Sequence, residues 1–279
     1  MAILSGRATL AGVLGWPVAH SRSPRIHGFW LRRYEIDGAY LPIAVHPDDF
    51  RTALNGLRAC GFAGVNVTIP HKVAAFAACD AVDDLARRIG AVNTLQFCGK
   101  RIVGTNTDCF GFLAGLQEAR IDPLCGPALV LGAGGAARSV VAPLRDLGAS
   151  VTICNRSPDR AEAVARNFAG TRLLAWDSRD AALGDFALVV NTTSLGMHGQ
   201  PPLELDFAAA GPHLAVCDLV YTPLETPLLR RARAAGLRTA DGLAMLLHQA
   251  RPGFASWFGV EPEVDDELRS FILRDLEAE

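Results

Sequence analysis

The segment around Lys72 contains residue types from which a small-molecule site can be built. In the predicted strand Val65–Ile69 polar and apolar residues alternate, and the two-residue period of a β-strand places Asn66 and Thr68 on one face. Pro70 has no N–H to donate and ends the strand, and Lys72 follows at the carboxyl end, where open α/β sheets bind ligands. These groups suit a hydroxylated or carboxylated small molecule. The alternative is a strand end with three solvated polar side chains.

A glycine-rich loop provides a second candidate site. The run Gly132-Ala133-Gly134-Gly135-Ala136-Ala137 follows the short apolar strand Ala128–Leu131 and leads into a predicted helix, Ala136–Leu147. This is the G-x-G-x-x-A pattern in the context that dinucleotide binding requires, because the glycines let the backbone approach a pyrophosphate at a helix N-terminus. The pattern predicts dinucleotide binding, with a turn kept for close packing of strand and helix as the alternative.

The end of the next strand distinguishes between the two nicotinamide cofactors. About 20 residues beyond the glycines, NAD sites carry an acidic residue that binds the ribose 2′-hydroxyl. Here the predicted strand Ser150–Cys154 is followed by Asn155-Arg156-Ser157, with Arg160 close behind. Two guanidinium groups and a hydroxyl suit a 2′-phosphate, so NADP is favoured. Asp159 keeps NAD open as an alternative, and the arginines can also be residues of an exposed helix face.

Composition and charge narrow the class of protein. The chain has 279 residues, 50% of them hydrophobic and 20% charged, with a net charge of −2; this length suggests about two globular domains. The net charge gives no basic surface that would indicate nucleic acid binding. No apolar run is long enough to span a bilayer. Arg7 interrupts the apolar run that a signal peptide would need. Seven cysteines without a C-x-x-C pair argue against a disulfide framework or a metal site and favour the cytoplasm.

Hydrophobic periodicity and turn residues outline the elements that position these groups. Strands are expected at Leu10–Leu14, Val65–Ile69, Ala91–Phe97, Arg101–Thr105, Ala128–Leu131, Ser150–Cys154, Phe186–Asn191 and Leu214–Leu219. In the first part of the chain, helices are expected from an Asp48 cap to Cys60, from an Asp83 cap to Gly90, and from Thr107 or Asp108 to Arg120. Further helices are expected over Ala136–Leu147, from Pro158, and from Thr226-Pro227 to near Gly236. The last two are expected over Gly242–Phe258, with a kink or break at Pro252, and from about Asp265. The alternation after Pro127 predicts a parallel, doubly wound sheet.

Several motifs together resemble those of the shikimate dehydrogenase family along nearly the whole chain. They are Ser21-Arg22-Ser23-Pro24 (S-x-S-P), Asn66 to Lys72 (N-V-T-x-P-x-K), Gly90-Ala91-Val92-Asn93-Thr94 (G-A-V-N-T), Asn106-Thr107-Asp108 (N-T-D), the glycine loop, Asn155-Arg156-Ser157, Asp218-Leu219-Val220-Tyr221 with Thr226-Pro227-Leu228 (D-x-x-Y and T-P-L), and Asp241-Gly242-Leu243 through Met245 and Gln249 (D-G-x-x-M…Q). Their joint occurrence in the family's order is far more specific than any one of them.

The resemblance implies an enzyme that reduces 3-dehydroshikimate to shikimate with NADPH and needs no metal. Lys72 and Asp108 would be the catalytic pair. The residues that would bind or line the substrate site are Ser21, Ser23, Asn66, Thr68, Asn93, Tyr221 and Gln249. The residues that would bind NADP are Gly132, Ala133, Gly134, Gly135, Ala136, Asn155, Arg156, Ser157, Arg160, Gly242 and Met245.

The resemblance also implies an α/β fold of two open αβα domains. The second would be a Rossmann-type parallel sheet inserted in the first, which C-terminal helices complete. Residues 1–107 would form the first part of the substrate-binding and catalytic domain, 108–242 the NADP-binding domain, and 243–279 the completing helices. The expected partner is shikimate or 3-dehydroshikimate, without nucleic acid or membrane, for a cytoplasmic monomer or homodimer.

Other interpretations of single residues stay open at this stage. Ser21 and Ser23 can be turn formers beside Pro24, Asp108 can be a helix N-cap, and Tyr221 can be a core aromatic residue.

Other functions also stay open. One is a broad-specificity quinate and shikimate dehydrogenase using NAD or NADP; some quinate-preferring members of the family carry threonine where this chain has Ser23. A tetrahydrofolate-dehydrogenase-like oxidoreductase would leave Ser21, Asn66, Thr68 and Asn93 unexplained. A catalytically silent sensor of NADP and a metabolite would have no need of both catalytic residues.

Overall fold

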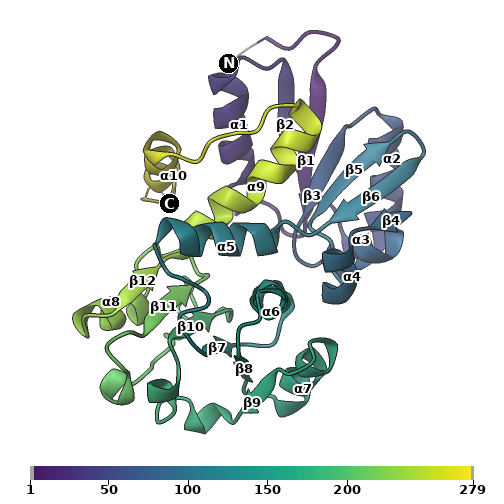
Figure 1. Cartoon of the computed structure of the whole chain (residues 1–279). Coiled ribbons are helices and arrows are strands. Elements are labelled where there is room, and N and C mark those ends of the chain that lie inside the picture. The colour runs from purple at the N-terminus through teal and green to yellow at the C-terminus, as the bar shows by residue number, and fades with distance from the viewer. Residues whose placement is uncertain (1–2, 278–279) are drawn as a thin grey trace. The chain divides into compact units, whose positions relative to one another are not determined.

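The chain divides into two units, each built around its own six-stranded sheet (Figure 1). The computed structural model describes residues 3–277. Unit 1 contains the chain up to Thr107 and again from Gln249, and unit 2 contains Asp108–His248. Unit 2 is therefore inserted between two parts of unit 1. The second border falls inside one helix, α9 (Gly242–Phe258), whereas the sequence places it at residue 242.

Unit 1 contains a mixed sheet with the strand order β2-β1-β3-β5-β6-β4. The bounds are β1 (Thr9–Gly15), β2 (Gly38–Ala44), β3 (Gly64–Val67), β4 (Ala81–Val82), β5 (Thr94–Cys98) and β6 (Arg101–Thr105). Strands β2, β1 and β3 are parallel, while β5 and β6 form an antiparallel hairpin around Gly99, whose φ is +61°. Strand β3 ends earlier than predicted, because the His71 N–H bonds to the Thr68 carbonyl at 2.9 Å and closes a turn there.

The helices of unit 1 include two that the sequence outlines well and one whose start it misplaces. The bounds are α1 (Ser23–Arg33), α2 (Phe50–Ala59), α3 (Lys72–Ala78), α4 (Asp84–Ile89) and α10 (Asp266–Glu277), with the end of α9. Asp83 caps α4 as predicted, accepting the Ala86 N–H at 2.6 Å. The predicted Asp48 cap is wrong, since a short 3-10 turn, η1 (Pro47–Asp49), precedes α2 and is capped by His46.

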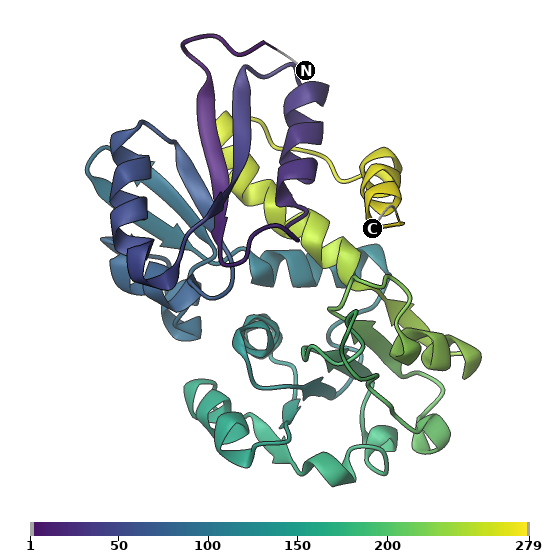
Figure 2. The same ribbon diagram turned by 180° about the vertical axis from the view of Figure 1, so that it is seen from behind.

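Aromatic residues of α9 complete the core of unit 1. Pro252 lies inside this helix, so of the predicted kink or break, the break is absent. The helix is continuous over its whole length and is seen as one ribbon in Figure 2. Near its end, Trp257 donates from Nε1 to the Leu95 carbonyl of β5 at 3.1 Å. A Cβ on Gly64 of β3 would collide with that nitrogen, so only glycine fits beneath the indole. The fully buried Phe254 lies one turn earlier in the same helix. The last helices are thus an integral part of unit 1.

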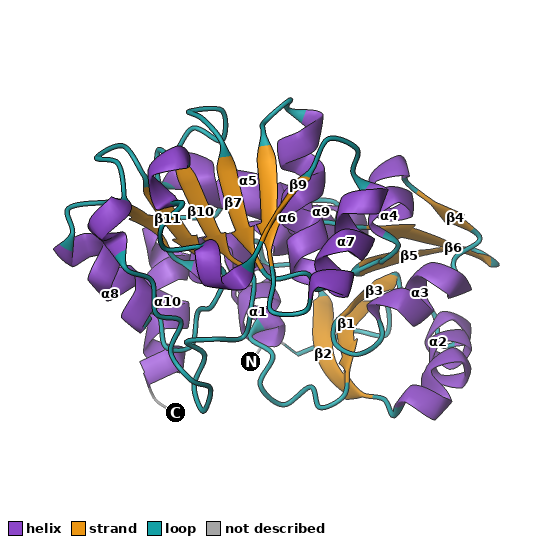
Figure 3. Cartoon of the chain, turned by 90° about the horizontal axis from the view of Figure 1, so that it is seen from below, coloured by secondary structure: helices purple, strands orange, loops and turns teal. Residues whose placement is uncertain are grey.

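Unit 2 contains a fully parallel sheet with the order β12-β11-β10-β7-β8-β9 (Figure 3). The bounds are β7 (Ala128–Leu131), β8 (Val151–Cys154), β9 (Arg172–Leu174), β10 (Leu188–Asn191), β11 (Ala215–Asp218) and β12 (Arg238–Ala240). Numbered within the unit, this is the doubly wound order 3-2-1-4-5-6 of dinucleotide-binding folds. The predicted Rossmann-type sheet is confirmed, with β9 and β12 as strands that the sequence did not indicate.

The helices of unit 2 begin within one residue of the starts that the sequence predicts. The bounds are α5 (Asp108–Glu118), α6 (Gly135–Asp146), α7 (Pro158–Asn167), α8 (Pro227–Ala234) and the start of α9, with short 3-10 turns η2 (Trp176–Ser178), η3 (Leu183–Asp185) and η4 (Phe207–Ala209). Pro158 is the first residue of α7, and Thr226 Oγ1 accepts the Leu229 N–H at 3.2 Å to cap α8. Within residues 3–277, no helix is long and apolar enough to cross a membrane.

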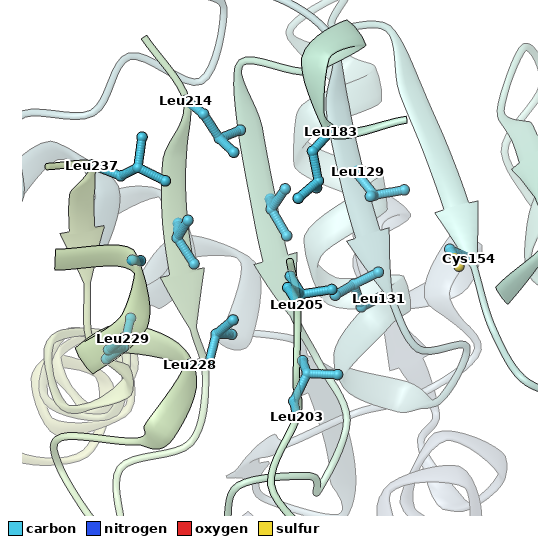
Figure 4. Close-up of a cluster of buried hydrophobic side chains, with 13 residues drawn as sticks. Leu129, Leu131, Cys154, Leu183, Leu203, Leu205, Leu214, Leu228, Leu229 and Leu237 are labelled. Carbon is cyan, nitrogen blue, oxygen red and sulfur yellow. The ribbon is translucent and has the colours of Figure 1, made fainter. Parts of the chain in front are cut away.

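One apolar cluster packs a face of the unit 2 sheet (Figure 4). Leu129 and Leu131 of β7 project to this face, where Leu228 and Leu229 of α8 and loop leucines such as Leu203 cover them. All four residues of β7 are buried, as expected for a parallel strand covered on both faces. This packing fixes the carboxyl end of β7, from which the glycine loop leaves.

Candidate active site

A network of buried polar side chains in unit 1 contains several of the predicted substrate-binding residues. The Tyr40 hydroxyl donates to Asn66 Oδ1 at 2.6 Å, and Asn66 Nδ2 donates to the Asn93 carbonyl at 3.2 Å and to Thr94 Oγ1 at 3.0 Å. Asn93 Oδ1 accepts the Thr107 N–H at 2.8 Å, and its Nδ2 donates to Thr107 Oγ1 at 3.0 Å. Since buried amides need partners on both ends, the network fixes the orientation of Asn66 and Asn93.

The serine loop leads into the start of α1. Ser23, the first residue of α1, is buried, and its N–H donates to Ser21 Oγ at 3.4 Å. Burial raises the pKa of Tyr40, and the Ser23 side chain has a smaller effect that lowers it. Arg22, between the serines, is buried and donates to Asp275 Oδ2 of α10 at 2.8 Å. An ion pair to the last helix therefore holds the loop.

Lys72 is the first residue of α3 and is half-buried. Its carbonyl accepts the Val92 N–H at 3.0 Å, next to Asn93 in the chain. The preceding turn is tied to the sheet, because the buried His71 ring donates from Nε2 to the Val45 carbonyl at 2.8 Å and the Thr68 N–H bonds to the Leu14 carbonyl of β1 at 2.9 Å. Backbone bonds thus fix the base of the lysine relative to the polar network.

The remaining predicted residues of this group lie at unit borders or in unit 2. Gln249 is half-buried in α9 at the point where the chain re-enters unit 1. Asp108 is the first residue of α5 in unit 2 and directly follows Thr107 of the network. Tyr221 lies in unit 2, in the loop after β11. The structure therefore unites Asn66 and Asn93 in one network.

The glycine loop of unit 2 has the geometry of a phosphate cradle. Gly132 has a φ of +110°, and a Cβ there would lie 2.5 Å from Thr192 Oγ1. A Cβ on Gly134 or Gly135 would meet no described residue within 4 Å beyond its own turn and chain neighbours. Gly134 is the N-cap of the twelve-residue helix α6 and offers no capping side chain. The open glycines leave the first N–H groups of α6 available to an anion, which fits the pyrophosphate of a dinucleotide.

The residues predicted to select NADP surround the start of α7. Asn155 Nδ2 donates to the Ser157 carbonyl at 2.9 Å, which closes the turn after β8. Ser157 is the N-cap of α7, and its hydroxyl makes no capping bond. Arg156 and Arg160 are exposed, and neither forms an ion pair with any residue in the described range. Two unpaired guanidinium groups beside a free hydroxyl fit a 2′-phosphate.

Buried polar groups also fix the loops that follow β10 and β11. The fully buried Asp218 accepts Asn191 Nδ2 at 2.8 Å, Thr226 Oγ1 at 2.7 Å and the Val220 N–H at 3.1 Å. Burial raises the pKa of this carboxyl, and the three hydrogen bonds oppose that shift. Since Val220 and Thr226 flank the Tyr221 loop in sequence, Asp218 ties both ends of that loop to the sheet.

Gly242 and Met245 belong to the first turns of α9. A Cβ on Gly242 would collide with the Leu219 carbonyl, so the helix start touches the loop after β11 and tolerates only glycine. Asp241 Oδ1 accepts the N–H groups of Leu243 and Ala244 at 3.0 and 3.3 Å and caps the helix. Met245 is half-buried.

The sequence did not single out two polar residues, one in the buried network of unit 1 and one among the partners of Asp218. Tyr40 lies on β2, a strand that the periodicity did not indicate, and no motif marks it. Asn191 ends the predicted strand Phe186–Asn191, and its position at a carboxyl strand end was an available signal. Among residues 3–277, no cluster of three or more His, Cys, Asp or Glu side chains is placed to hold a metal ion.

A parallel sheet of this order, with an open glycine loop at a helix N-terminus, defines unit 2 as a dinucleotide-binding α/β fold. The chain belongs to the shikimate dehydrogenase family. Residues 13–95 match the shikimate dehydrogenase substrate binding domain, and residues 122–196 match the shikimate / quinate 5-dehydrogenase domain. The family resemblance of the motifs is thereby confirmed.

Similar proteins cover almost the whole chain. Shikimate dehydrogenase (NADP(+)) of Acidiphilium cryptum is 64% identical over 98% of this chain and 99% of its own length. The structure of shikimate 5-dehydrogenase from Thermus thermophilus in complex with NADP(H) and shikimate is 38% identical, with a TM-score of 0.86 over 97% of this chain and 99% of that one. Quinate dehydrogenase from Corynebacterium glutamicum in complex with NAD is 29% identical, with a TM-score of 0.89 over 96% and 99%.

Proposed function

We propose that this chain is a shikimate dehydrogenase that reversibly reduces 3-dehydroshikimate to shikimate with NADPH. The observation that carries the proposal is the buried network in which Tyr40, Asn66, Asn93 and Thr107 hold one another in fixed orientations. Such a set suits a ring that carries a carboxylate and several hydroxyls, because each oriented group recognises one donor or acceptor. The NADP(+)-dependent relative with 64% identity supports the same activity.

The cofactor, when bound, supplies the hydride, and the protein supplies position and a proton. Lys72 is the proposed general acid: its ammonium stabilises the negative charge that develops on the substrate oxygen and donates a proton to it. In the oxidation direction the neutral amine accepts the hydroxyl proton. Asp108 is proposed to orient the ammonium and to accept a hydrogen bond from the neighbouring hydroxyl. Ser21 and Ser23 are proposed to bind the carboxylate, and Asn66, Thr68, Asn93 and Gln249 the hydroxyls.

The cofactor is held by unit 2 in this proposal. The N–H groups at the open start of α6 bind the pyrophosphate, and Arg156, Arg160 and Ser157 bind the 2′-phosphate. Gly242 and Met245 are proposed to lie along the cofactor, with Tyr221 lining the pocket near the nicotinamide. We also propose a cytoplasmic monomer or homodimer; the seven free cysteines are in keeping with a reducing compartment.

A second candidate is a broad-specificity quinate and shikimate dehydrogenase. The 29% identity to an NAD-bound quinate dehydrogenase favours it. Ser23, in place of a threonine, and the two unpaired arginines argue for shikimate and NADP instead.

The deciding experiment follows nicotinamide absorbance with shikimate or quinate, each paired with NADP⁺ or NAD⁺. Turnover confined to shikimate with NADP⁺ is the expected result. Comparable turnover with quinate or NAD⁺ would assign the chain to the broad-specificity group, and NADP⁺ binding without turnover of either substrate would identify a sensor.

A further inference from the structure

Tyr40 is held at one place in the core of unit 1 by aromatic packing. Its ring stacks on the imidazole of His27, with centroids 3.8 Å apart and planes 4° from parallel, and it lies 6.1 Å from the Trp257 ring. His27 is fully buried, and within the described residues neither of its ring nitrogens has a hydrogen-bond partner. A stacked ring on a parallel strand pair has little freedom, so the Tyr40 hydroxyl is directed at a fixed point.

The direction of the hydrogen bond between Tyr40 and Asn66 follows from what each atom can do. Asn66 Oδ1 only accepts, so the 2.6 Å contact uses the single proton of the Tyr40 hydroxyl. Burial raises the pKa of Tyr40 well above its usual value, so this proton stays in place at working pH.

The Tyr40 proton decides what Asn66 offers to a ligand. Both protons of Asn66 Nδ2 are used, by the Asn93 carbonyl at 3.2 Å and Thr94 Oγ1 at 3.0 Å. A flipped amide would place its oxygen against the Asn93 carbonyl, so that orientation is excluded. With Oδ1 already bonded to Tyr40, the amide keeps one lone pair, and Asn66 presents an acceptor suited to a substrate hydroxyl.

We propose that Tyr40 is a positioning residue for substrate binding: its hydroxyl fixes Asn66 as an acceptor for a substrate hydroxyl. This inference rests on the proposed function, since it concerns the same site. Tyr40 touches no reacting atom in this proposal and acts through Asn66.

The test is the Tyr40→Phe variant, which keeps the stacked ring and removes only the hydroxyl. We expect the KM for shikimate to rise about tenfold or more, the loss that one buried hydrogen bond to an oriented polar group produces. The KM for NADP⁺ should stay within about twofold and kcat within about threefold, because the variant changes neither the glycine loop nor Lys72.

Tyr34→Phe is the matched control. The Tyr34 hydroxyl also makes one described hydrogen bond, accepting the Glu263 N–H at 3.0 Å in the same unit. Y40F should lower the midpoint of thermal unfolding more than Y34F, because it leaves a buried acceptor unpaired whereas the Tyr34 bond is exposed, and the assays are run below both midpoints. Only Y40F should change the KM for shikimate. An unchanged or lower KM in Y40F would leave Tyr40 a purely structural residue and overturn the inference.

A double-mutant cycle separates action through Asn66 from an independent effect. If Tyr40 acts through Asn66, adding Y40F to Asn66→Ala should raise the KM by less than about twofold over N66A alone. A full, additive increase would overturn that part of the inference. The wild-type protein decides the proposed function separately, because a chain that fails to oxidise shikimate with NADP⁺ refutes the function whatever Y40F does.

Discussion

Arg22 and Asp275 form an ion pair at 2.8 Å between residues separated by 253 positions in the sequence. The guanidinium lies between the two serines of the S-x-S-P loop, and the carboxylate belongs to the last helix, α10. Arg25 bonds to the other oxygen of Asp275 at 2.9 Å. Both partners of the Arg22 pair are largely buried, so the end of the chain sets the position of a loop near its beginning.

Asp275→Asn should weaken both the fold and substrate binding. A buried guanidinium that loses its countercharge destabilises a protein by about 3 kcal/mol, and the loosened serine loop should raise the KM for shikimate several-fold without changing that for NADP⁺. Chemical denaturation and steady-state kinetics measure the two effects. Asp266→Asn, an exposed residue in the first turn of α10, is the control and should cost less than about 1 kcal/mol. Equal behaviour of the two variants would contradict the role of the pair.

Lys72→Met should remove turnover and leave cofactor binding intact. Loss of a general acid typically costs 10²–10⁴-fold in rate, so we expect kcat to fall by at least about 100-fold. The sequence has only two lysines, and the exposed Lys100 in the β5–β6 turn provides the control, Lys100→Met. Fluorescence titration with NADPH should give the same affinity for all three proteins. A K72M enzyme with near-normal kcat would refute the assignment of Lys72.

Arg156→Ala should reduce the preference for NADP⁺ over NAD⁺. A charge-assisted bond to a phosphate contributes about 1.5–3 kcal/mol, so the KM for NADP⁺ should rise roughly 10- to 100-fold while that for NAD⁺ hardly changes. Arg166→Ala is the control, since Arg166 lies near the end of α7, the helix that follows Arg156, and forms an ion pair with Glu162 at 3.6 Å. Equal losses with both cofactors would mean that Arg156 does not contact the 2′-phosphate.

The stability of the protein should fall in acid because of His27. Burial lowers the pKa of this histidine from 6.5 to about 3, so the unfolded chain binds a proton below pH 6.5 that the folded chain rejects. The stability is complete above pH 6.5 and declines by up to about 1.4 kcal/mol per pH unit below it. Compared with His27→Phe, the wild type should lose free energy of unfolding between pH 7 and 5. His213→Gln, at an exposed site, should leave the pH profile unchanged.

Asp218 should make the free energy of unfolding depend on pH in the direction opposite to His27, and Asp218→Asn should remove that dependence. Burial raises the pKa of Asp218 above its ordinary value of 3.8, so the folded state holds this proton more tightly than the unfolded chain does. That contribution is complete below pH 3.8 and is lost as pH rises through the folded-state pKa. Relative to D218N, the wild type should therefore gain stability as pH falls.

At neutral pH, D218N should cost about 1–3 kcal/mol, because an amide cannot accept all three bonds that Asp218 accepts. Asp206→Asn is the control, since Asp206 is exposed and its carboxylate accepts the Ala208 N–H at 3.0 Å. Urea denaturation across pH separates the two variants, and parallel pH profiles for D218N and wild type would contradict the assignment.

The sequence predicts what depends on local pattern. The strand Ala128–Leu131 matches β7 residue for residue, because a parallel strand buried on both faces appears as an unbroken apolar run. The glycine loop and the Thr226 cap of α8 are equally local. In each of these elements, the residues that determine the local structure lie within a few positions of one another in the sequence.

What the sequence does not predict depends on partners far away in the chain. Tyr40 meets Asn66 from a neighbouring part of the sheet, 26 positions away, and β2 has too irregular a pattern, with Pro42 inside it, to be recognised as a strand. The start of α2 was misplaced for a smaller reason, because His46 and Pro47 form a 3-10 turn that takes up Asp48. Which of several polar residues caps a turn depends on tertiary packing as well as on residue type.

The insertion of unit 2 into unit 1 has a consequence for how the protein is made. Trp257 and Phe254 of α9 leave the ribosome only after all of Asp108–His248 has been synthesised. At about 5–20 residues per second this takes on the order of ten seconds. During that time the sheet of β1–β6 has no α9 to cover it, whereas the Rossmann-type unit has all its strands as soon as Ala240 is made. The part of the chain made first is thus the last to be completed.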